Sequence, residues 1–338
     1  MIYQNIELFN VAEAVQVPGR PGVLLQRVPE EVRGLLREVS QTQLRQAACC
    51  EIRFVSDWKP VNVTLVSYGT PCMASIYLGD FQVGQQMIST EPTKITVTIP
   101  SPHFLSQPDF DASLFPFSPA VSRVMFAGQE IHFLSIEGES IRPPKKEETP
   151  QLRFLAYGTS ITQGYAATNS ELTYVKQLAW RLGADAINLG VSGSAFCEKP
   201  ITDYIVSRDD WDFATLCLSV NMLNQEVPAA SFSEIAKEMI MAIAKKSPQK
   251  PVFCISLLPS CMDIGFRWPE RNPTSTADEY RRVIQTIVEE ANLSNLHYID
   301  GKQLISNLTG LSHDLLHPSD HGMIEIGEKL AKLIRPLL

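Results

Sequence analysis

Residues 153–164 read Arg-Phe-Leu-Ala-Tyr-Gly-Thr-Ser-Ile-Thr-Gln-Gly, an apolar run that stops at a hydroxyl-rich turn between two glycines. The run is short and apolar throughout after Arg153, which predicts a strand buried on both faces of a sheet. A serine or threonine at the end of such a turn favours the start of a helix. The stretch therefore predicts a strand-to-helix junction at Ser160.

The same pattern, a short apolar run followed by a helical stretch, occurs four more times in the second half of the chain. Uniformly apolar strands separated by helical stretches are typical of a parallel sheet covered by helices on both faces. We therefore expect a three-layer α/β/α domain with a five-stranded parallel sheet, and ligands beyond the carboxyl ends of its strands. The expected strands are 153–157, 185–189, 213–220, 251–258 and 296–300, and the expected helices lie near 172–182, 200–206, 231–246, 276–292 and 319–335.

The first half of the chain has a different pattern. Short β-branched and aromatic stretches separated by turn residues predict an antiparallel β-sandwich of the jelly-roll kind. They lie at 51–57, 61–68, 74–80 and 93–99, with a further pair on either side of Gly128-Gln129. The prolines and charges of residues 142–150 leave nothing to bury and mark a linker. The sequence thus predicts a β-sandwich domain at 1–141, a linker at 142–150 and an α/β domain at 151–338.

Composition limits the classes of partner. The 338 residues carry 29 Lys plus Arg against 37 Asp plus Glu, a net charge of −8, which disfavours nucleic acid and anionic membrane surfaces. The sequence contains no uninterrupted run of about 18 apolar residues, which a membrane span would need. Residues 1–17 lack the basic residues with which a signal peptide begins. Seven cysteines without CxxC spacing indicate reduced thiols in a cytoplasmic protein. The sequence leaves the oligomeric state open, including a homo-oligomer.

Ser160 is a candidate nucleophile, because it follows the first parallel strand at the edge where ligands are expected. The plainer interpretation is a helix-capping serine. Three glycine-loop motifs do not fit. No GxGxxG is present, Tyr165 stands where a phosphate-binding loop needs lysine, and Ser194 occupies the second glycine of a GxSxG elbow.

A serine nucleophile needs a base, and His317 is the best placed of the six histidines. It lies in the loop after the last predicted strand, three residues after Asp314, whose carboxylate could fix the imidazole tautomer. The spacing of His313, His317 and His321 also suits a zinc site on one helix face. Pro318 argues against a continuous helix through His317, so we expect neither a metal nor a cofactor.

Four sequence blocks resemble those of the SGNH (GDSL-type) hydrolases. They come in the family's order, and each follows its own predicted strand. Thr159 stands where the family usually has aspartate, and Ser219 where it usually has glycine. The blocks are Gly158-Thr159-Ser160-Ile161-Thr162, Asn188-Leu189-Gly190-Val191-Ser192-Gly193, Leu218-Ser219-Val220-Asn221 and Asp314-Leu315-Leu316-His317-Pro318.

The resemblance implies a function and a set of roles. Ser160 would attack an acyl carbonyl, His317 would move the proton and Asp314 would orient His317. The N–H groups of Ser160 and Gly193 and the amide of Asn221 would form the oxyanion hole. The expected activity is a serine esterase that removes short acyl groups, acetyl above all, from a carbohydrate or similar alcohol.

The β-rich first half resembles the accessory sandwich of two-domain SGNH esterases, including carbohydrate acetyl esterases. Glu198, Trp268 and residues 259–276 are candidates to shape the substrate pocket. The alternatives are a thioesterase or lysophospholipase of the same family, and a non-catalytic glycan-binding protein.

Overall fold

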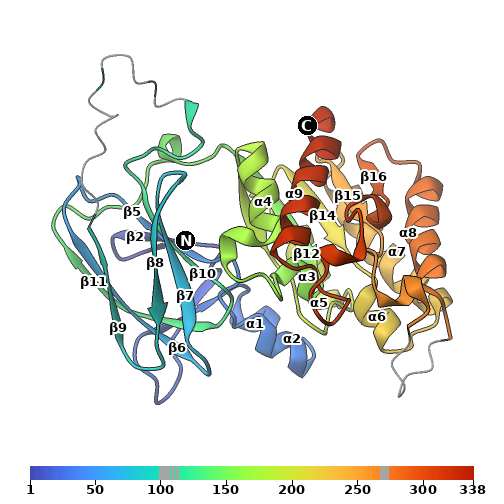
Figure 1. The fold of residues 1–338 in the computed structure, drawn as a ribbon, viewed down its shortest axis with the longest axis horizontal. Helices are drawn as coiled ribbons and strands as arrows, with labels where there is room; N and C mark the ends of the chain where they lie inside the picture. Colours follow the sequence, from blue (N-terminus) through green and yellow to red (C-terminus); the bar gives the residue numbers. More distant parts are fainter. Residues whose placement is uncertain (99–106, 108–110, 112–113, 267–273) are drawn as a thin grey trace.

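The computed structural model describes residues 1–98, 107, 111, 114–266 and 274–338, and Trp268 lies outside this range. Antiparallel strands fill one end of the molecule and an α/β unit fills the other (Figure 1). The fold class predicted from the sequence is confirmed on both counts.

The α/β unit is built on a five-stranded sheet in which every pairing is parallel. Its order places the first strand of the unit, β12, between β13 and β14. The carboxyl ends of these three neighbours therefore meet at one edge. In spatial order the strands are β13 (Ala184–Asn188), β12 (Leu152–Gly158), β14 (Phe213–Cys217), β15 (Val252–Ile255) and β16 (Leu296–Ile299).

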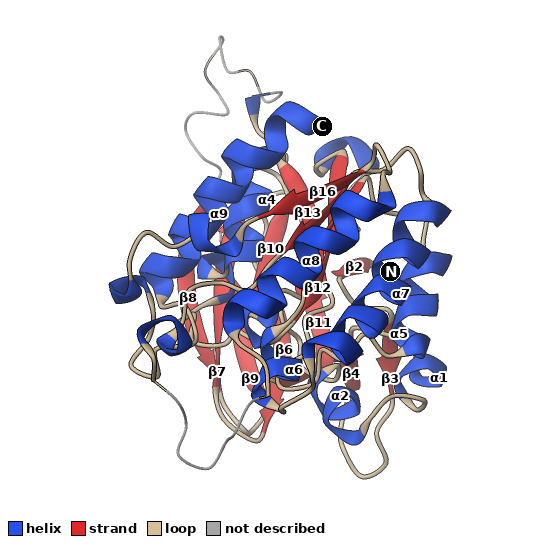
Figure 2. Cartoon of the chain, turned by 90° about the vertical axis from the view of Figure 1, so that its right-hand side faces the viewer, coloured by secondary structure: helices blue, strands red, loops and turns tan. Residues whose placement is uncertain are grey.

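Helices cover both faces of this sheet (Figures 1 and 2). Alternate residues of β12 divide between the two layers, since Phe154 belongs to the core under α4 and α9, and Leu155 to the core under α5, α7 and α8. A strand with apolar residues on both faces needs such cover, which is why the sequence shows no polar alternation there. The covering helices are α4 (Tyr174–Leu182), α9 (Asp320–Ile334), α5 (Lys199–Ser207), α7 (Ala229–Lys246) and α8 (Ala277–Ala291).

The β-rich unit contains two antiparallel sheets with one shared apolar core. The first sheet has the order β1 (Ile2–Tyr3), β2 (Ile6–Phe9), β5 (Glu51–Phe54), β10 (Ser122–Phe126), β7 (Cys72–Leu78) and β8 (Phe81–Ile88). The second has the order β3 (Glu13–Val15), β4 (Val23–Gln26), β11 (Glu130–Gly138), β6 (Val61–Tyr68) and β9 (Thr93–Val97).

Several features differ from the sequence expectations or were not predicted. The strand expected at 213–220 ends at Cys217, because the chain turns at Ser219 into the short helix α6 (Val220–Asn224). Strand β8 was not predicted, since it is an edge strand with an exposed, glutamine-rich sequence that lacks an apolar run. The first 48 residues supply β1 to β4 and two short helices, α1 (Glu30–Arg33) and α2 (Glu38–Gln43).

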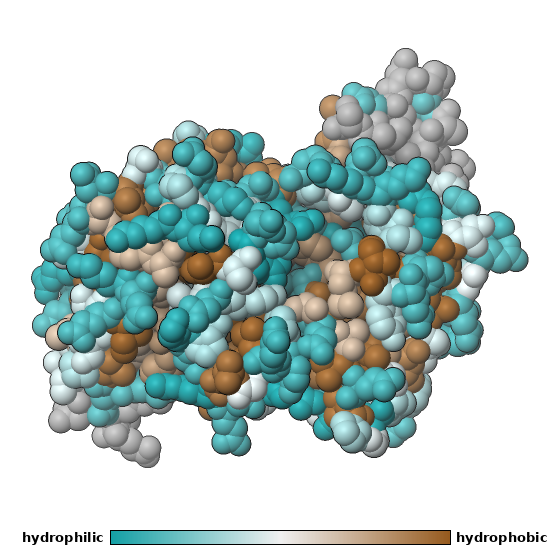
Figure 3. All heavy atoms as spheres, turned by 180° about the vertical axis from the view of Figure 1, so that it is seen from behind, coloured by the Kyte–Doolittle hydropathy of each residue, from teal (hydrophilic) through white to brown (hydrophobic). Residues whose placement is uncertain are grey.

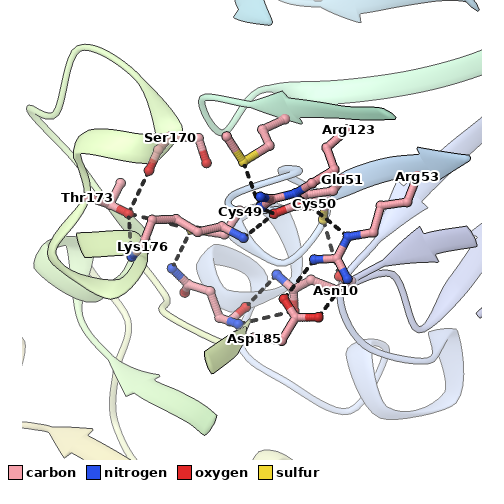
Figure 4. A network of polar contacts seen from close by, with 12 residues as sticks. Asn10, Cys49, Cys50, Glu51, Arg53, Arg123, Ser170, Thr173, Lys176 and Asp185 are labelled. Carbon is pink, nitrogen blue, oxygen red and sulfur yellow. Dashed lines mark hydrogen bonds and ion pairs between the residues drawn. The ribbon is translucent and has the colours of Figure 1, made fainter. Parts of the chain in front are cut away.

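The two units are joined by a buried ionic network (Figure 4). Glu51 on β5 accepts hydrogen bonds from Arg53, from Arg123 on β10 and from Lys176 on α4. Arg53 also binds both oxygens of Asp185 on β13, at 2.6 and 2.7 Å. Because Lys176 and Asp185 belong to the α/β unit and the others to the sandwich, the network fixes one unit against the other.

Three cations set the ionisation of Glu51. Burial alone would raise the pKa of its carboxyl, but Arg123, Arg53 and Lys176 outweigh that effect and hold the pKa well below its usual range. Glu51 is therefore ionised while it is buried.

The surface seen from behind is mostly hydrophilic, with apolar residues in separate spots (Figure 3). In the described part of the chain, no helix has the length and apolar character needed to cross a membrane. All seven cysteines are buried and none forms a disulfide.

Candidate active site

Ser160 begins α3 (Ser160–Gln163), directly beyond the carboxyl end of β12. Thr159, in the position before it, accepts a hydrogen bond from the N–H of Ile161 and so caps this helix. The first N–H groups of a helix have no partner within the helix, so the N–H of Ser160 is a candidate donor to an oxyanion. Thr159 thus caps α3 at the position where the family usually has aspartate.

The structure brings the three predicted catalytic residues into one hydrogen-bonded chain. The Ser160 Oγ lies 2.8 Å from His317 Nε2, and His317 Nδ1 lies 2.6 Å from Asp314 Oδ2. Both ring nitrogens of His317 are therefore engaged. A serine, an imidazole and a carboxylate in this order are the arrangement that activates a hydroxyl as a nucleophile.

The loop around Asp314 is shaped by that carboxylate. Its Oδ1 accepts hydrogen bonds from the backbone N–H groups of Leu316 and His317 and from the hydroxyl of Ser312, at 2.8 to 2.9 Å. A short acidic side chain that caps the backbone two and three residues later is a common turn device. It leaves Oδ2 free for the imidazole.

The same contacts set the ionisation of Asp314. Burial would raise its pKa, but the hydrogen bonds from the His317 ring, the two backbone N–H groups and Ser312 outweigh burial and hold the pKa below its usual range. The carboxylate is therefore charged at neutral pH and can stabilise an imidazolium beside it.

The two remaining predicted residues lie after the strands that flank β12. Gly193 follows β13 and has φ +70°, a left-handed conformation that favours glycine. Asn221 follows β14 on α6, and its Oδ1 accepts the N–H of Ala195 at 3.0 Å. That bond turns the Asn221 amide so that its NH₂ group remains available as a donor.

His313, His317 and His321 do not come together as a group of metal ligands. In the described part of the chain, no group of three or more His, Cys, Asp or Glu side chains is arranged to hold a metal ion. His317 uses both ring nitrogens on Ser160 and Asp314, and His321 lies in the first turn of α9 beyond Pro318.

Glu198, a candidate to shape the substrate pocket, contacts helix α2. Its carboxylate accepts the N–H of Arg37 at 2.8 Å and the hydroxyl of Ser40 at 2.6 Å, so it binds the start of α2. Trp268 lies outside the described residues.

Sequence reasoning missed three side chains at the site. The ring of Tyr165 lies against His317, with 4.4 Å between ring centroids. Val39 on α2 lies beside Gly193, 4.0 Å from where a side-chain carbon on that glycine would be. Gln163 binds the loop before Gly193, with its Oε1 2.7 Å from the N–H of Ser192. No local signal marks Val39, because it lies about 150 residues before Gly193.

The α/β unit matches the model of a known family. The model of the GDSL-like lipase/acylhydrolase family matches residues 151–335. A search of curated proteins finds no match.

Several solved structures share the fold. A salicylyl-acyltransferase from a tetracycline biosynthetic pathway has 14% identity and a TM-score of 0.80, over 99% of this chain and 95% of that one. A family two carbohydrate esterase from Clostridium thermocellum, in complex with cellohexaose, has 14% identity and a TM-score of 0.60, over 86% of this chain and 93% of that one. An acetyl xylan esterase from the rumen bacterium Butyrivibrio proteoclasticus has 10% identity and a TM-score of 0.55, over 98% of each chain.

At these identities the structural likeness concerns the fold, whereas the family match covers more than half of the chain, 185 of its 338 residues. With its parallel sheet and the sandwich before it, this chain belongs to the GDSL-like lipase/acylhydrolase family and is an ester hydrolase of the SGNH type.

Proposed function

We propose that this protein is a serine esterase that removes short acyl groups, acetyl above all, from a carbohydrate or similar alcohol. The observation that carries the proposal is the hydrogen-bonded chain from Ser160 through His317 to Asp314. The carbohydrate part is supported by the carbohydrate esterases that share the fold.

The geometry supports a two-step mechanism. Ser160 Oγ attacks the acyl carbonyl while its proton passes to His317 Nε2, and the charged Asp314 stabilises the imidazolium that forms. His317 then gives the proton to the leaving alcohol oxygen as the bond from carbon to that oxygen breaks. Water attacks the resulting acyl-serine, His317 takes a proton from it, and the carboxylic acid leaves as Ser160 regains its hydrogen.

The oxyanion of each tetrahedral intermediate would be held by the N–H groups of Ser160 and Gly193 and by the amide of Asn221. Each group follows one of three neighbouring strands, so they approach the reacting carbon from one sheet edge. Loss of one such donor typically costs about 2.7–4 kcal/mol of transition-state stabilisation.

The preference for a small acyl group is supported by the position of α2. Val39 lies 4.0 Å from where a side-chain carbon on Gly193 would be, so a residue of the N-terminal part of the chain stands next to the oxyanion loop. A filled pocket rejects each extra methylene by about 1–3 kcal/mol. We therefore expect kcat/KM to be highest for acetyl and to fall beyond about four carbons.

The test combines substrates with a nucleophile variant. Nitrophenyl esters of increasing chain length, acetylated sugars and an acyl-thioester are compared for the wild type and for Ser160→Ala. We expect turnover to fall by more than about a thousandfold in the variant, since loss of a triad nucleophile usually costs more than that. Circular dichroism and the thermal midpoint serve as the folding control.

Three outcomes would change the assignment. Turnover retained by Ser160→Ala would remove the serine mechanism, and rates that climb steadily to octanoyl would favour a lysophospholipase or thioesterase. Hydrolysis should also survive prolonged chelation and stop with a serine-directed phosphonate, because the nucleophile is a side-chain oxygen. Binding of sugars without any turnover would favour a non-catalytic glycan-binding protein.

A further inference from the structure

Gln163 is the last residue of α3, one helical turn after Ser160, and its side chain joins three parts of the molecule. We propose that it is a positioning residue: through it, the N-terminal segment 27–46 holds the loop that carries the oxyanion donor Gly193. This inference rests on the proposed function, because it concerns the same oxyanion hole.

The first link runs from α3 to the oxyanion loop. The Gln163 side chain is buried, and its Oε1 accepts the N–H of Ser192 at 2.7 Å. Gly190 lies against the backbone of Gln163, where an added side-chain carbon would come within 2.3 Å of the Gln163 nitrogen. The helix of the nucleophile and the loop of the oxyanion donor therefore share two close contacts, one of which fixes the residue directly before Gly193.

The second link runs from Gln163 to the N-terminal segment. Its Nε2 donates to Oε1 of Gln43 at 2.9 Å and to Oε1 of Gln46 at 2.6 Å. The amide thus uses both N–H groups on one side and its oxygen on the other. Turning the amide would point its NH₂ group at the N–H of Ser192, which would lose its acceptor, so the orientation with Oε1 toward Ser192 is the satisfied one.

The N-terminal segment is itself fixed to the same loop on either side of Ser192. The Arg27 guanidinium donates to the carbonyls of Asn188 and Gly190, at 3.1 and 2.8 Å. The Ser40 hydroxyl lies 2.8 Å from that of Ser194. The loop 188–194 is thus held before, at and after the residue that Gln163 binds.

These contacts have a consequence for catalysis. The direction of the Gly193 N–H depends on the peptide plane that follows Ser192, and oxyanion donors act only when they point to where the charge develops. A misplacement of about 1 Å can cost about a hundredfold in rate. Removal of the Gln163 bonds should therefore lower kcat more than it raises KM.

The experiment compares three variants with the wild type on p-nitrophenyl acetate. Gln163→Met keeps the size of the side chain and removes its hydrogen bonds, and Gln43→Met/Gln46→Met alters only the N-terminal partners. Gln177→Met is the matched control. That glutamine also makes two side-chain hydrogen bonds, to Glu171 O and from Arg181, but lies on α4 away from Ser192.

We expect kcat to fall by about 10- to 100-fold in Gln163→Met and by less in the double variant, with KM within about twofold of the wild type. The affinity for phenylboronic acid, whose serine adduct places an oxygen in the oxyanion hole, should fall in the same order. Gln177→Met should keep both values, whatever its effect on the thermal midpoint.

A merely structural role for Gln163 would lower the thermal midpoint and leave kcat and boronate affinity of the folded enzyme unchanged, and that result overturns the proposal. If Gln163→Met does not fold, unchanged kcat in the double variant overturns it instead. Ser160→Ala is assayed in parallel. Lost turnover there with normal turnover in the other variants defeats only this inference, whereas retained turnover in Ser160→Ala defeats the proposed function and this inference with it.

Discussion

At the scale of the residue, the site depends on which atom of each side chain carries a hydrogen. Asp314 accepts at both oxygens and keeps its charge, so His317 is held with its proton on Nδ1 and its Nε2 free to accept from Ser160. An asparagine in the place of Asp314 would present an NH₂ group to Nδ1. The imidazole would then carry its proton on the nitrogen that faces the serine.

Asp314→Asn should therefore lower kcat by about 10³- to 10⁴-fold while the loop keeps its shape, because Oδ1 can still accept the two backbone N–H groups. Steady-state kinetics on p-nitrophenyl acetate measures the effect. His313→Asn, one position earlier and exposed, is the control and should leave kcat unchanged. A loss of activity in His313→Asn that added zinc restores would instead favour the metal alternative.

Ser219 has a strained backbone conformation and a buried hydroxyl. It has φ +105° and ψ −65°, in the region that favours glycine, and its buried hydroxyl has no hydrogen-bond partner among the described residues. A strained residue of this kind costs on the order of 1–3 kcal/mol. The strain lies directly between β14 and Asn221.

Ser219→Gly should raise the free energy of unfolding by about 1–3 kcal/mol, since it relieves the strain and deletes the unpartnered hydroxyl. Urea unfolding followed by tryptophan fluorescence measures the change. Ser219→Ala removes only the hydroxyl and keeps the side-chain carbon, so it should recover less. If the alanine variant gains as much as the glycine variant, backbone strain at this position contributes nothing.

At the scale of the element, the chain must return across the sheet to complete the site. β16 lies at the opposite edge of the sheet from β13, and Ser160 follows β12, the neighbour of β13. Residues 300–319 bridge that distance through two short 3₁₀ turns and end in α9, which packs on α4. The start of α9 therefore fixes where His317 stands.

Two glycines of α9 allow this idea to be tested. A side-chain carbon on Gly322 would lie 2.1 Å from Gly310 O and 3.1 Å from Pro318, the residue after His317. One on Gly327 would lie 2.5 Å from Gln177 on α4, away from the catalytic loop. Gly322→Ala should lower both stability and kcat, whereas Gly327→Ala should lower stability alone, by about 1–3 kcal/mol in each case.

Urea midpoints and kcat for both variants decide the matter. A helical Gly→Ala change in open space would raise stability by up to about 1 kcal/mol, so a fall in either midpoint already reports the steric contact. If kcat in Gly322→Ala equals that of Gly327→Ala, the start of α9 does not set the position of His317.

At the scale of the whole molecule, the buried network makes the two units depend on each other. Glu51 forms ion pairs with three cations, which are Arg53, Arg123 and Lys176. Lys176 belongs to the α/β unit, so its ion pair with Glu51 crosses the boundary between the units. Removing one partner of a buried ion pair typically costs about 3–5 kcal/mol, because the other charge stays buried. The sandwich and the α/β unit should therefore unfold together.

Glu51→Gln should lower the free energy of unfolding by about 3–5 kcal/mol. Spectroscopic signals from the sandwich and from the α/β unit should still change together, in one unfolding transition at lower urea. Glu139→Gln breaks the exposed pair with Lys59 and should leave the urea midpoint unchanged. Equal midpoints in the two variants would show that the network adds nothing to stability. Two separate transitions in the wild type would show that the units are uncoupled.

The stabilisation that Glu51 provides should decrease at acidic pH. The pKa of Glu51 is lower in the folded chain than in the unfolded chain, so its stabilisation is fully present above the unfolded value, about 4.3. It is lost as the pH falls through the depressed folded value. Acid unfolding of the wild type should therefore steepen below about pH 4, and Glu51→Gln should lack that part of the profile.

The sequence by itself determined the fold class and the catalytic candidates. Uniformly apolar strands and the turn residues after them are local features, so the parallel sheet, Ser160 and the pair Asp314 and His317 could be named from residues close in the chain. The sandwich followed from the same kind of local pattern. The domain bounds, the linker at 142–150 and the roles of all five site residues stay predictions; these residues are Ser160, His317, Asp314, Gly193 and Asn221.

Only the tertiary structure decided which polar residues meet across the chain. Gln163 lies more than 110 residues from Gln43 and Gln46, and Glu51 lies 125 residues from Lys176. A glutamine or a lysine in a sequence carries no sign of its distant partner, since hydrogen bonds and ion pairs depend on where the backbone brings two atoms. Strand β8 could not be predicted from the sequence for a related reason, since an exposed strand at the edge of a sheet needs no apolar pattern.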